Sequence, residues 1–258
     1  MQRELDVAIK AARSAGELIE RMQQASPAAH AKGVAHNIVT EADLAAEKLI
    51  LGMLTESFPD HSILSEEGGG AEQQSSHLWA VDPLDGTNNY AHRFPHYAVS
   101  IALWTDGQPA VGVIYDPTRD ELFHAVAGQG AFLNNVPIHV TSSASINDAI
   151  LATGFYYDRG DMMRRTLKLI EGFFDQPIRR IRRTGSAALD LCYVACGRLD
   201  GFWELRLSPW DYAAGNLIVL EAGGRVTDVT GGPCRIDMNN VLVSNGHIHQ
   251  QMLEVVRA

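Results

Sequence analysis

The sequence is poor in cysteine, has no excess of basic residues and lacks any long apolar run. Its 258 residues include three cysteines, an odd number without a CxxC pair. We expect Cys192 and Cys196 to be buried free thiols, which fits a reducing cytoplasm. No apolar stretch approaches the roughly 20 residues that a membrane span needs. Charged residues also interrupt the N-terminus where a signal peptide would have its apolar core.

The charge balance is acidic. Lysine and arginine number 21 against 31 aspartates and glutamates, which gives a formal net charge of -10. This balance argues against general binding to nucleic acid or to anionic membranes. One local basic cluster exists at Arg179, Arg180, Arg182 and Arg183, and we expect it to be a solvated face. With 46% hydrophobic and 20% charged residues, the chain has the profile of an ordinary soluble globular protein with a substantial core.

The first part of the chain predicts two helices followed by mainly antiparallel strands. Apolar or small residues recur at helical spacing over residues 2–24. A second helix is expected to begin at Thr40, where Asp43 completes a capping-box pattern. The following segments alternate and are separated by turn residues, which is typical of strands: 97–104, 109–116, 121–126 and a hairpin within 130–140.

From about residue 150 onward, predicted strands alternate with predicted helices. The expected strands are 150–155, 201–205, 226–229 and 241–245. The expected helices are 161–174, 185–197, 211–224 and 247–258. Alternation of this kind favours an α/β or α+β fold in which helices cover sheets.

Two acids, Asp82 and Asp85, follow an apolar strand in the stretch LWAVDPLDGT. Pro83 stiffens the backbone between them, and two like charges at this spacing repel each other. Gly86 and Thr87 follow at once and could open a helix, whose free N–H groups would attract an anion. Carboxylates beside an anion site need cations between them, and hard oxygen ligands suit Mg²⁺. Ordinary turns and helix caps remain the alternative, because the DxxD spacing is common.

Further acids occur beside turn-like residues at Glu66 and Asp211. A solvated loop would equally explain Glu66, and a helix N-cap would explain Asp211. Each acid alone is weak evidence for a site.

Longer motifs resemble the signatures of the inositol monophosphatase family. WAVDPLDGTNNYAH is similar to its first signature, and WDYAAGNLIVLEAGG is similar to its second. Between them, RRTGSAALDLCYVACGRLDGFWE resembles the bacterial members, including the subgroup known as the SuhB type. The match extends from about Lys32 to Ser244. It implies an alternating αβαβα sandwich, with an N-terminal part (1–150) that carries an antiparallel sheet and most metal ligands, and a C-terminal part (151–258) that completes the site.

The resemblance also implies a set of metal ligands. Glu66, Asp82 and the carbonyl of Leu84 would bind one Mg²⁺, and Asp82, Asp85 and Asp211 a second. Glu66 would also help to hold a weaker third ion, so two to three ions are expected in the site.

Catalytic and substrate-binding roles follow from the same resemblance. Thr87 and Asp43 would orient and deprotonate the attacking water, with Glu66 also counted among the catalytic residues. The backbone of Gly86 and Thr87 would hold the phosphate. Lys32 would lie on a loop near the metals. The alcohol part of the substrate would face Gly185, Ser186, Ala187 and Glu204, with Asp85 and Asp211 at the same site.

The implied activity is Mg²⁺-dependent hydrolysis of a phosphorylated polyol, foremost inositol 1-phosphate, by metal-activated water. Related enzymes hydrolyse fructose 1,6-bisphosphate, histidinol phosphate, NADP or 3'-phosphoadenosine nucleotides, and these substrates remain alternatives. Lithium inhibition and a homodimer are expected by the same resemblance. The SuhB type also acts as a partner in transcription complexes, which gives a third hypothesis of a different class.

Three residues to which the resemblance assigns no role in the site have simpler expected roles. Arg206 is expected to point outward, although a cation two residues beyond Glu204 could alter substrate preference. Trp210 is expected in the core. His249, at the start of a predicted helix, is expected to be a solvent-exposed capping residue.

Overall fold

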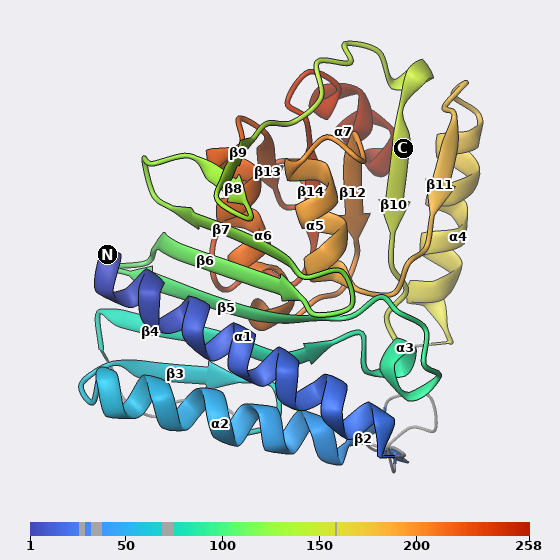
Figure 1. Ribbon diagram of the computed structural model, residues 1–258. Helices are drawn as coiled ribbons and strands as arrows, with labels where there is room; N and C mark the ends of the chain where they lie inside the picture. Colours follow the sequence, from blue (N-terminus) through green and yellow to red (C-terminus); the bar gives the residue numbers. More distant parts are fainter. Residues whose placement is uncertain (26–28, 32–37, 69–74, 158) are drawn as a thin grey trace.

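The computed structural model describes residues 1–25, 29–31, 38–68, 75–157 and 159–258. Five layers alternate between helices and sheets (Figure 1). Helices α1 (Gln2–Gln24) and α2 (Glu41–Ser57) cover one face of a seven-stranded sheet. Helices α5 (Ala187–Ala195) and α6 (Pro209–Glu221) fill the space between this sheet and a five-stranded one. Helices α4 (Asp161–Phe174) and α7 (His249–Arg257) cover the far face of the second sheet, so the expected αβαβα sandwich is confirmed.

The seven-stranded sheet has the order β3-β4-β5-β6-β7-β8-β9. Its first pair, β3 and β4, is parallel, and every other pair is antiparallel. The strands are β3 (Ser62–Ser65), β4 (His77–Asp85), β5 (Ala98–Thr105), β6 (Gln108–Asp116), β7 (Glu121–Val126), β8 (Ala131–Leu133) and β9 (Val136–Ile138).

The five-stranded sheet is mixed and has the order β11-β10-β12-β14-β13. Strand β10 lies parallel to both of its neighbours, whereas β14 lies antiparallel to β12 and β13. The strands are β10 (Ile150–Thr153), β11 (Arg180–Arg182), β12 (Gly201–Glu204), β13 (Arg225–Thr227) and β14 (Val241–Ser244). Loops that leave the carboxyl ends of β10, β11 and β12 therefore emerge at one edge of this sheet.

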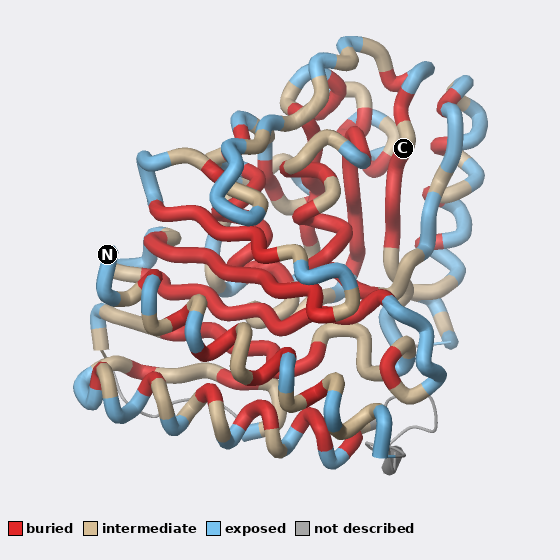
Figure 2. The backbone as a smooth tube through the Cα atoms, viewed as in Figure 1, coloured by how far each residue is buried: buried red, intermediate tan, exposed pale blue. Residues whose placement is uncertain are grey.

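Both sheets are buried on two faces, which Figure 2 shows as red strands in the interior. Side chains of a strand point alternately to opposite faces. In β4, Trp79 and Val81 pack against α1 and α2, while Ala80 between them joins the core around α5 and α6. That middle core contains residues from both 1–150 and 151–258, and the expected division of the chain near residue 150 stays a prediction.

The long elements match the expectations from periodicity, and several of the short ones do not. Thr40 caps α2 and Asp43 completes the capping box, as predicted. Four short strands were not predicted, because three or four residues carry too little periodic pattern. They are β1 (Ala29–Ala31), β2 (Ile38–Thr40), β3 and β11. The short helix α3 (Thr87–Ala91) begins where Gly86 and Thr87 were expected to open a helix.

Two expectations about single residues are corrected by burial. His249 is fully buried and lies within hydrogen-bond distance of Thr227 Oγ1 (3.0 Å) and Ser244 Oγ (2.9 Å), so it is not a solvent-exposed cap. Trp210 is only half-buried and is therefore not a core residue. Within the described residues, no helix combines the length and apolar character that crossing a membrane requires.

Candidate active site

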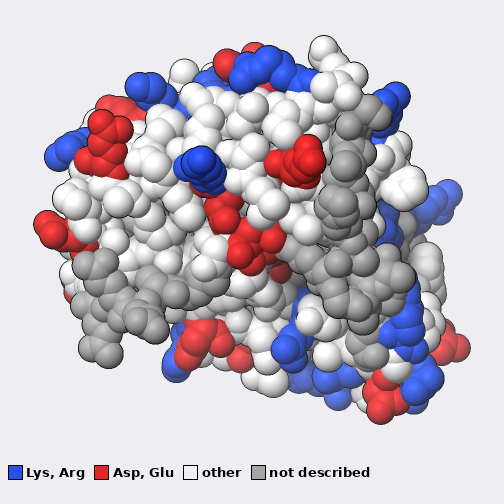
Figure 3. Space-filling view, turned by 90° about the horizontal axis from the view of Figure 1, so that it is seen from below, with Lys and Arg blue, Asp and Glu red and all other residues white. Residues whose placement is uncertain are grey.

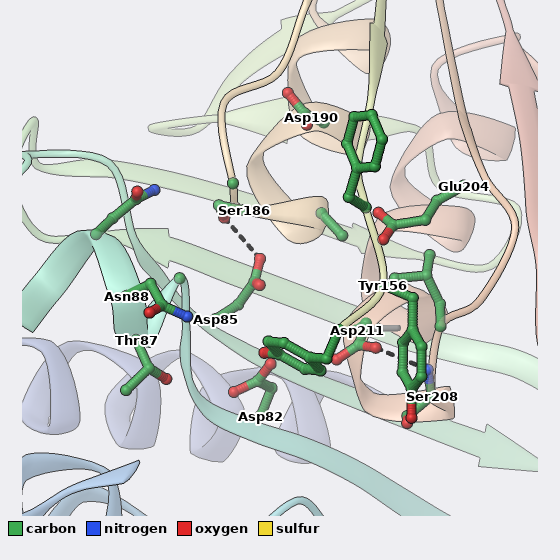
Figure 4. A pocket seen from close by; sticks show the side chains of 18 of the residues that line it. Asp82, Asp85, Thr87, Asn88, Tyr156, Ser186, Asp190, Glu204, Ser208 and Asp211 are labelled. Atoms are coloured by element: carbon green, nitrogen blue, oxygen red, sulfur yellow. Dashed lines mark hydrogen bonds between the residues drawn. The ribbon is translucent and has the colours of Figure 1, made fainter. Parts of the chain in front are cut away.

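A pocket of about 330 Å³ lies where strand ends from both sheets meet the middle helices (Figure 4). The end of β4 contributes Asp82 and Asp85, and the turn after β3 contributes Glu66. Loops after β10, β11 and β12 and the start of α6 supply the opposite wall. Ligands of open α/β sheets commonly bind outside the carboxyl ends of the strands, and the pocket lies at such an edge. Seen from below, acidic side chains gather near the middle of the molecular surface, with most basic ones toward its margin (Figure 3).

The Asp-Pro-Leu-Asp segment breaks the ladder at the end of β4. The pairing with β5 shifts register between Asp82 and Asp85, because Pro83 has no N–H to donate. Asp82 Oδ1 accepts a hydrogen bond of 3.0 Å from the Leu84 N–H, which folds the turn back on itself. Gly86 then adopts a φ of +96°, and a Cβ there would lie 3.0 Å from the His96 carbonyl oxygen. The turn into α3 therefore requires glycine for its conformation and for its close packing.

Asp85 is held by the amino end of α5. Its Oδ2 accepts hydrogen bonds from Ser186 Oγ (2.6 Å) and from the Ala188 N–H (2.7 Å). Ser186 is also the N-cap of this helix and accepts a bond from the Leu189 N–H. The contact joins the end of β4 to the segment 185–187 and brings two predicted parts of the site together.

The acids of the pocket oppose one another's ionisation. Burial raises the pKa of Asp82 well above its usual range, and the charges of Glu66, Asp85 and Asp211 raise it further. Burial raises the pKa of Asp85 to about 6, although the bonds from Ser186 and Ala188 oppose the rise. Burial and then the charge of Asp85 raise the pKa of Asp211. This arrangement is unfavourable for four anions and suits bound cations, which would stabilise the charged forms.

The donor chemistry fits a hard, water-retaining cation. The candidate donors are all oxygen atoms: the carboxylates of Glu66, Asp82, Asp85 and Asp211 and the carbonyl of Leu84. Histidine and cysteine are absent from the described pocket lining. Across the part of the chain that the structure describes, no group of three or more acidic, histidine or cysteine side chains is arranged to hold a metal ion by itself. Mg²⁺ commonly binds through few protein ligands and several waters, so an open acidic pocket is compatible with it.

A second cluster joins Asp43 on α2 to Thr87 on α3. Asp43 Oδ2 accepts hydrogen bonds from the backbone N–H of Thr40 (2.8 Å) and from its hydroxyl. Its other oxygen, Oδ1, lies 2.9 Å from Thr87 Oγ1, which also lies 3.0 Å from the Leu84 carbonyl oxygen. Burial raises the pKa of Asp43, against the opposing effect of these hydrogen bonds. One carboxylate thus serves both as a helix cap and as a partner of the pocket hydroxyl.

Glu204 lies at the end of β12 and is buried against Gly154. A Cβ added to Gly154 would collide with the Glu204 carboxylate, so only glycine fits beside it. Burial raises the pKa of Glu204 well above its usual range, and the nearby charges of Asp211, Asp190 and Asp85 add to the rise. This shift favours the protonated form relative to an exposed glutamate, and a protonated carboxyl group can both donate and accept hydrogen bonds.

The structure brings together nearly all residues that the motifs predicted. The pocket lining includes Glu66, Asp82, Leu84, Asp85, Gly86, Thr87, Gly185, Ser186, Ala187, Glu204 and Asp211, and Asp43 contacts it through Thr87. Lys32 lies outside the described residues. Arg206 is exposed, as an outward orientation requires, but it also lines the pocket, which keeps open its effect on substrate preference.

Other lining residues were not predicted. Asp190 is a buried acid on the first turn of α5, bonded to Thr184 Oγ1 at 2.8 Å. Its place within TGSAALDL, an acid among small and apolar residues, was the available signal. Tyr156, Arg183 and Trp210 also line the pocket. Arg183 and Trp210 lie within the quoted motifs but were given no role in the site, and no motif covers Tyr156.

Comparisons with known proteins agree with this geometry. A family model described as "Inositol monophosphatase family" matches residues 1–258. The chain is 43% identical over 255 residues to Nus factor SuhB of Escherichia coli (98% of this chain, 95% of that protein). It is 42% identical over 259 residues to inositol-1-monophosphatase of Synechocystis sp. (100% of this chain, 90% of that protein). The solved inositol monophosphatase from Anabaena (Nostoc) sp. superposes with a TM-score of 0.86 at 40% identity, covering 99% of this chain and 96% of that one.

Proposed function

The chain belongs to the inositol monophosphatase family and is a phosphatase, and on that premise we propose that it hydrolyses the phosphate ester of a small polyol. Inositol 1-phosphate is the leading substrate. The observation that carries this proposal is the joining, in one pocket, of mutually repelling carboxylates, the Asp43–Thr87 pair and the buried Glu204.

Mg²⁺ is the proposed cofactor, with two to three ions in the site. Glu66, Asp82, Asp85 and Asp211, with the Leu84 carbonyl, would hold them. When bound, the metal supplies an activated water and neutralises charge on the phosphoryl oxygens and the leaving alkoxide.

Asp43 and Thr87 are the proposed base and its relay. Because Thr40 occupies Oδ2 of Asp43, only Oδ1 faces the Thr87 hydroxyl. Thr87 would orient the attacking water through its oxygen while its proton stays directed at Asp43. A raised pKa strengthens a carboxylate as a base, which supports this role for Asp43. The backbone of Gly86 and Thr87 would hold the phosphate.

The alcohol part of the substrate is proposed to lie against Glu204 and the segment 185–187. Glu204 would donate to or accept from substrate hydroxyls, and Gly185, Ser186 and Ala187 would shape the neighbouring wall. Asp85 and Asp211 border the same space and would also meet the substrate.

Phosphate release from a panel of esters tests the proposal. The panel contains myo-inositol 1-phosphate, fructose 1,6-bisphosphate, histidinol phosphate, NADP and a 3'-phosphoadenosine nucleotide, each with and without Mg²⁺. Asp82→Asn is the site variant, and Asp6→Asn, an exposed acid on α1, is the matched control. Thermal melting of both variants with and without Mg²⁺ provides a second measurement that does not depend on turnover.

The expected result is Mg²⁺-dependent release from the inositol ester that Asp82→Asn loses and Asp6→Asn keeps. Mg²⁺ should also raise the melting temperature of the control but not of Asp82→Asn, because a ligand of the folded state stabilises it. A preference for another ester would show that the proposed substrate is wrong and would leave the proposed site unchanged. Absence of turnover with every ester would refute the enzymatic proposal.

Several broader properties belong to the same proposal. Lithium inhibition and a homodimer are inferred from family membership. A cytoplasmic location is supported by the three free cysteines, one buried and two half-buried, which are characteristic of a reducing compartment.

A role as partner of a transcription complex is a second proposal. It is supported by the 43% identity to a protein named Nus factor SuhB and by strand β11, whose Arg180 and Arg182 are exposed at the sheet edge. Direct binding of nucleic acid is not proposed, given the net charge of -10. Co-purification with transcription proteins that persists in Asp82→Asn and disappears in a doubly substituted Arg180→Gln, Arg182→Gln variant would support the role. Loss in neither variant would exclude β11 as the contact.

A further inference from the structure

Two loops of the pocket wall run side by side because their strands are paired. Strands β10 and β12 are parallel, with Thr153 opposite Trp203. The next residues, Gly154 and Glu204, contact each other closely. Two residues further along each loop, Tyr156 and Arg206 also meet, so the register of the sheet continues into the pocket wall.

Arg206 lies over the ring of Tyr156. Its guanidinium carbon is 5.4 Å from the ring centroid, within the range of a cation–π contact. Tyr156 remains 39% exposed, and both side chains line the pocket. The aromatic ring restrains the long arginine side chain while its hydrogen-bond donors stay available.

The two arginines of the pocket have different electrostatic surroundings. Arg183 lies close enough to Asp190 and Glu204 to oppose the rise of their pKa values, so buried acids already offset its charge. Within the described part of the chain, Arg206 forms no hydrogen bond or ion pair, and its guanidinium lies over the Tyr156 ring. Among those residues it is therefore a cation on the pocket wall without a paired acid.

We propose that Arg206, oriented by Tyr156, is a specificity-determining residue that lets the pocket also accept, beside the inositol ester, esters whose alcohol part carries a second anionic group. The inference rests on the proposed function. The reacting phosphate would lie at the acidic end of the pocket and the alcohol beside Glu204. Since Arg206 lies two residues beyond Glu204 on the same loop, a phosphate or carboxylate on the distal part of the alcohol would meet its guanidinium. Arginine binds such groups through two parallel N–H donors.

Binding of a matched pair of non-hydrolysable ligands tests the proposal directly. Hexane-1,6-bisphosphonate carries an anion at each end, whereas 6-hydroxyhexylphosphonate has a neutral hydroxyl at the distal end. Calorimetric titration in the presence of Mg²⁺ would compare the wild-type protein with Arg206→Gln and Arg206→Lys. The control is Arg165→Gln, which removes the same charge from an exposed position on α4.

Arg206→Gln should weaken binding of the bisphosphonate by about five- to tenfold, the discrimination of one charge-assisted contact at an exposed site. Binding of the hydroxyl ligand should change less than about twofold, since it makes no charge-assisted contact with Arg206. Arg206→Lys should restore part of the difference, and Arg165→Gln should leave it intact. Equal effects on both ligands, or no effect on either, would overturn the specificity role. Phosphate release from the ester panel is a separate assay, so failure of the proposed function is distinguishable from failure of this subsite.

Discussion

Ser186 donates a hydrogen bond of 2.6 Å to Asp85, although 101 positions of the sequence separate the two residues. The bond connects the end of β4 with the amino end of α5. It therefore fixes the orientation of a proposed metal ligand from the opposite wall of the pocket. Sequence motifs predicted that both residues belong to the site. Only the structure shows that Ser186 holds the Asp85 carboxylate in place.

Replacing Ser186 by alanine should impair the site more than the fold. The variant loses a helix cap, which costs about 1 kcal/mol of stability, and it frees the Asp85 carboxylate from one of its donors. We expect kcat/KM for the preferred ester to fall by about tenfold, the effect of one lost hydrogen bond to a charged group. Ser145→Ala is the matched control, because Ser145 caps the 3-10 turn Ile146–Asp148 away from the pocket. Similar kinetic losses in both variants would argue against a positioning role for Ser186.

Thr87 allows a test of the proposed base. Thr87→Val keeps the shape of the side chain but removes the hydroxyl between Asp43 and the Leu84 carbonyl, whereas Thr87→Ser keeps that hydroxyl. We expect kcat to fall about 100-fold in the valine variant, the usual size of a general-base contribution, and to stay within about threefold in the serine variant. Steady-state phosphate release with saturating Mg²⁺ measures both. If the valine variant retains full kcat, the relay through Thr87 does not operate.

Gly154 and Gly52 form a contrasting pair for substitution by alanine. At Gly154 the new methyl group would collide with the Glu204 carboxylate, so we expect a loss of about 1–3 kcal/mol in unfolding free energy and a higher KM. At Gly52, in the interior of α2, a Cβ would meet nothing within 4 Å. Alanine there should stabilise the protein by about 0.5–1 kcal/mol, because it is the better helix former. Urea unfolding of the two variants measures whether the unfolding free energy falls in Gly154→Ala and rises in Gly52→Ala. A Gly154→Ala variant as stable as wild type would contradict the packing described for Glu204.

His249 should make the protein sensitive to acid. Burial, and then the charge of Arg225, lower the pKa of His249 to about 4 from an ordinary value of 6.5. The folded protein therefore holds the neutral ring. Its contribution to stability is complete above pH 6.5 and is lost as the pH falls toward 4, because the unfolded chain binds the proton first. We expect about 3 kcal/mol to be lost over this window, at about 1.4 kcal/mol for each unit by which the pKa is lowered.

Comparing the pH dependence of stability in wild type and in His249→Gln separates the contribution of His249 from that of the pocket acids. The raised pKa values of those acids favour the folded protein as the pH falls, which is the opposite effect. His249→Gln should be less stable at neutral pH and should show a flatter pH dependence between 6.5 and 4. His247→Gln, which replaces an exposed histidine two residues away, should keep the wild-type slope. Parallel slopes for wild type and His249→Gln would exclude the buried ring as the source.

Much of the fold was predictable from periodicity and turn residues. Helix α4 was predicted with its observed bounds, because its apolar face repeats over 14 residues. The edge strand β11 was missed, since three residues with two arginines carry no strand pattern. His249 was misjudged because it lies at a helix start, where exposure is common. Its burial depends on Thr227 and Ser244 in two other strands.

Site residues that lie in motifs were predictable from the sequence, whereas those brought into the site by strand pairing were not. Asp82, Asp85 and the Gly-Thr pair are adjacent in the sequence, and the resemblance to a family, not their spacing, implied that Glu66 and Asp211 join them. Arg206 and Tyr156 meet only because β10 and β12 are paired in one register. Register depends on the whole sheet, and no local pattern of residues near position 156 or 206 encodes it.

The middle layer of helices has a consequence for protein synthesis. Asp82 and Asp85 leave the ribosome early, but Glu204, Asp211 and the two helices that cover the inner face of the first sheet follow more than 100 residues later. Until then, that sheet has one apolar face without its covering layer and an acidic site without its opposite wall. The nascent protein therefore completes the proposed catalytic pocket and covers this apolar face in the same late event.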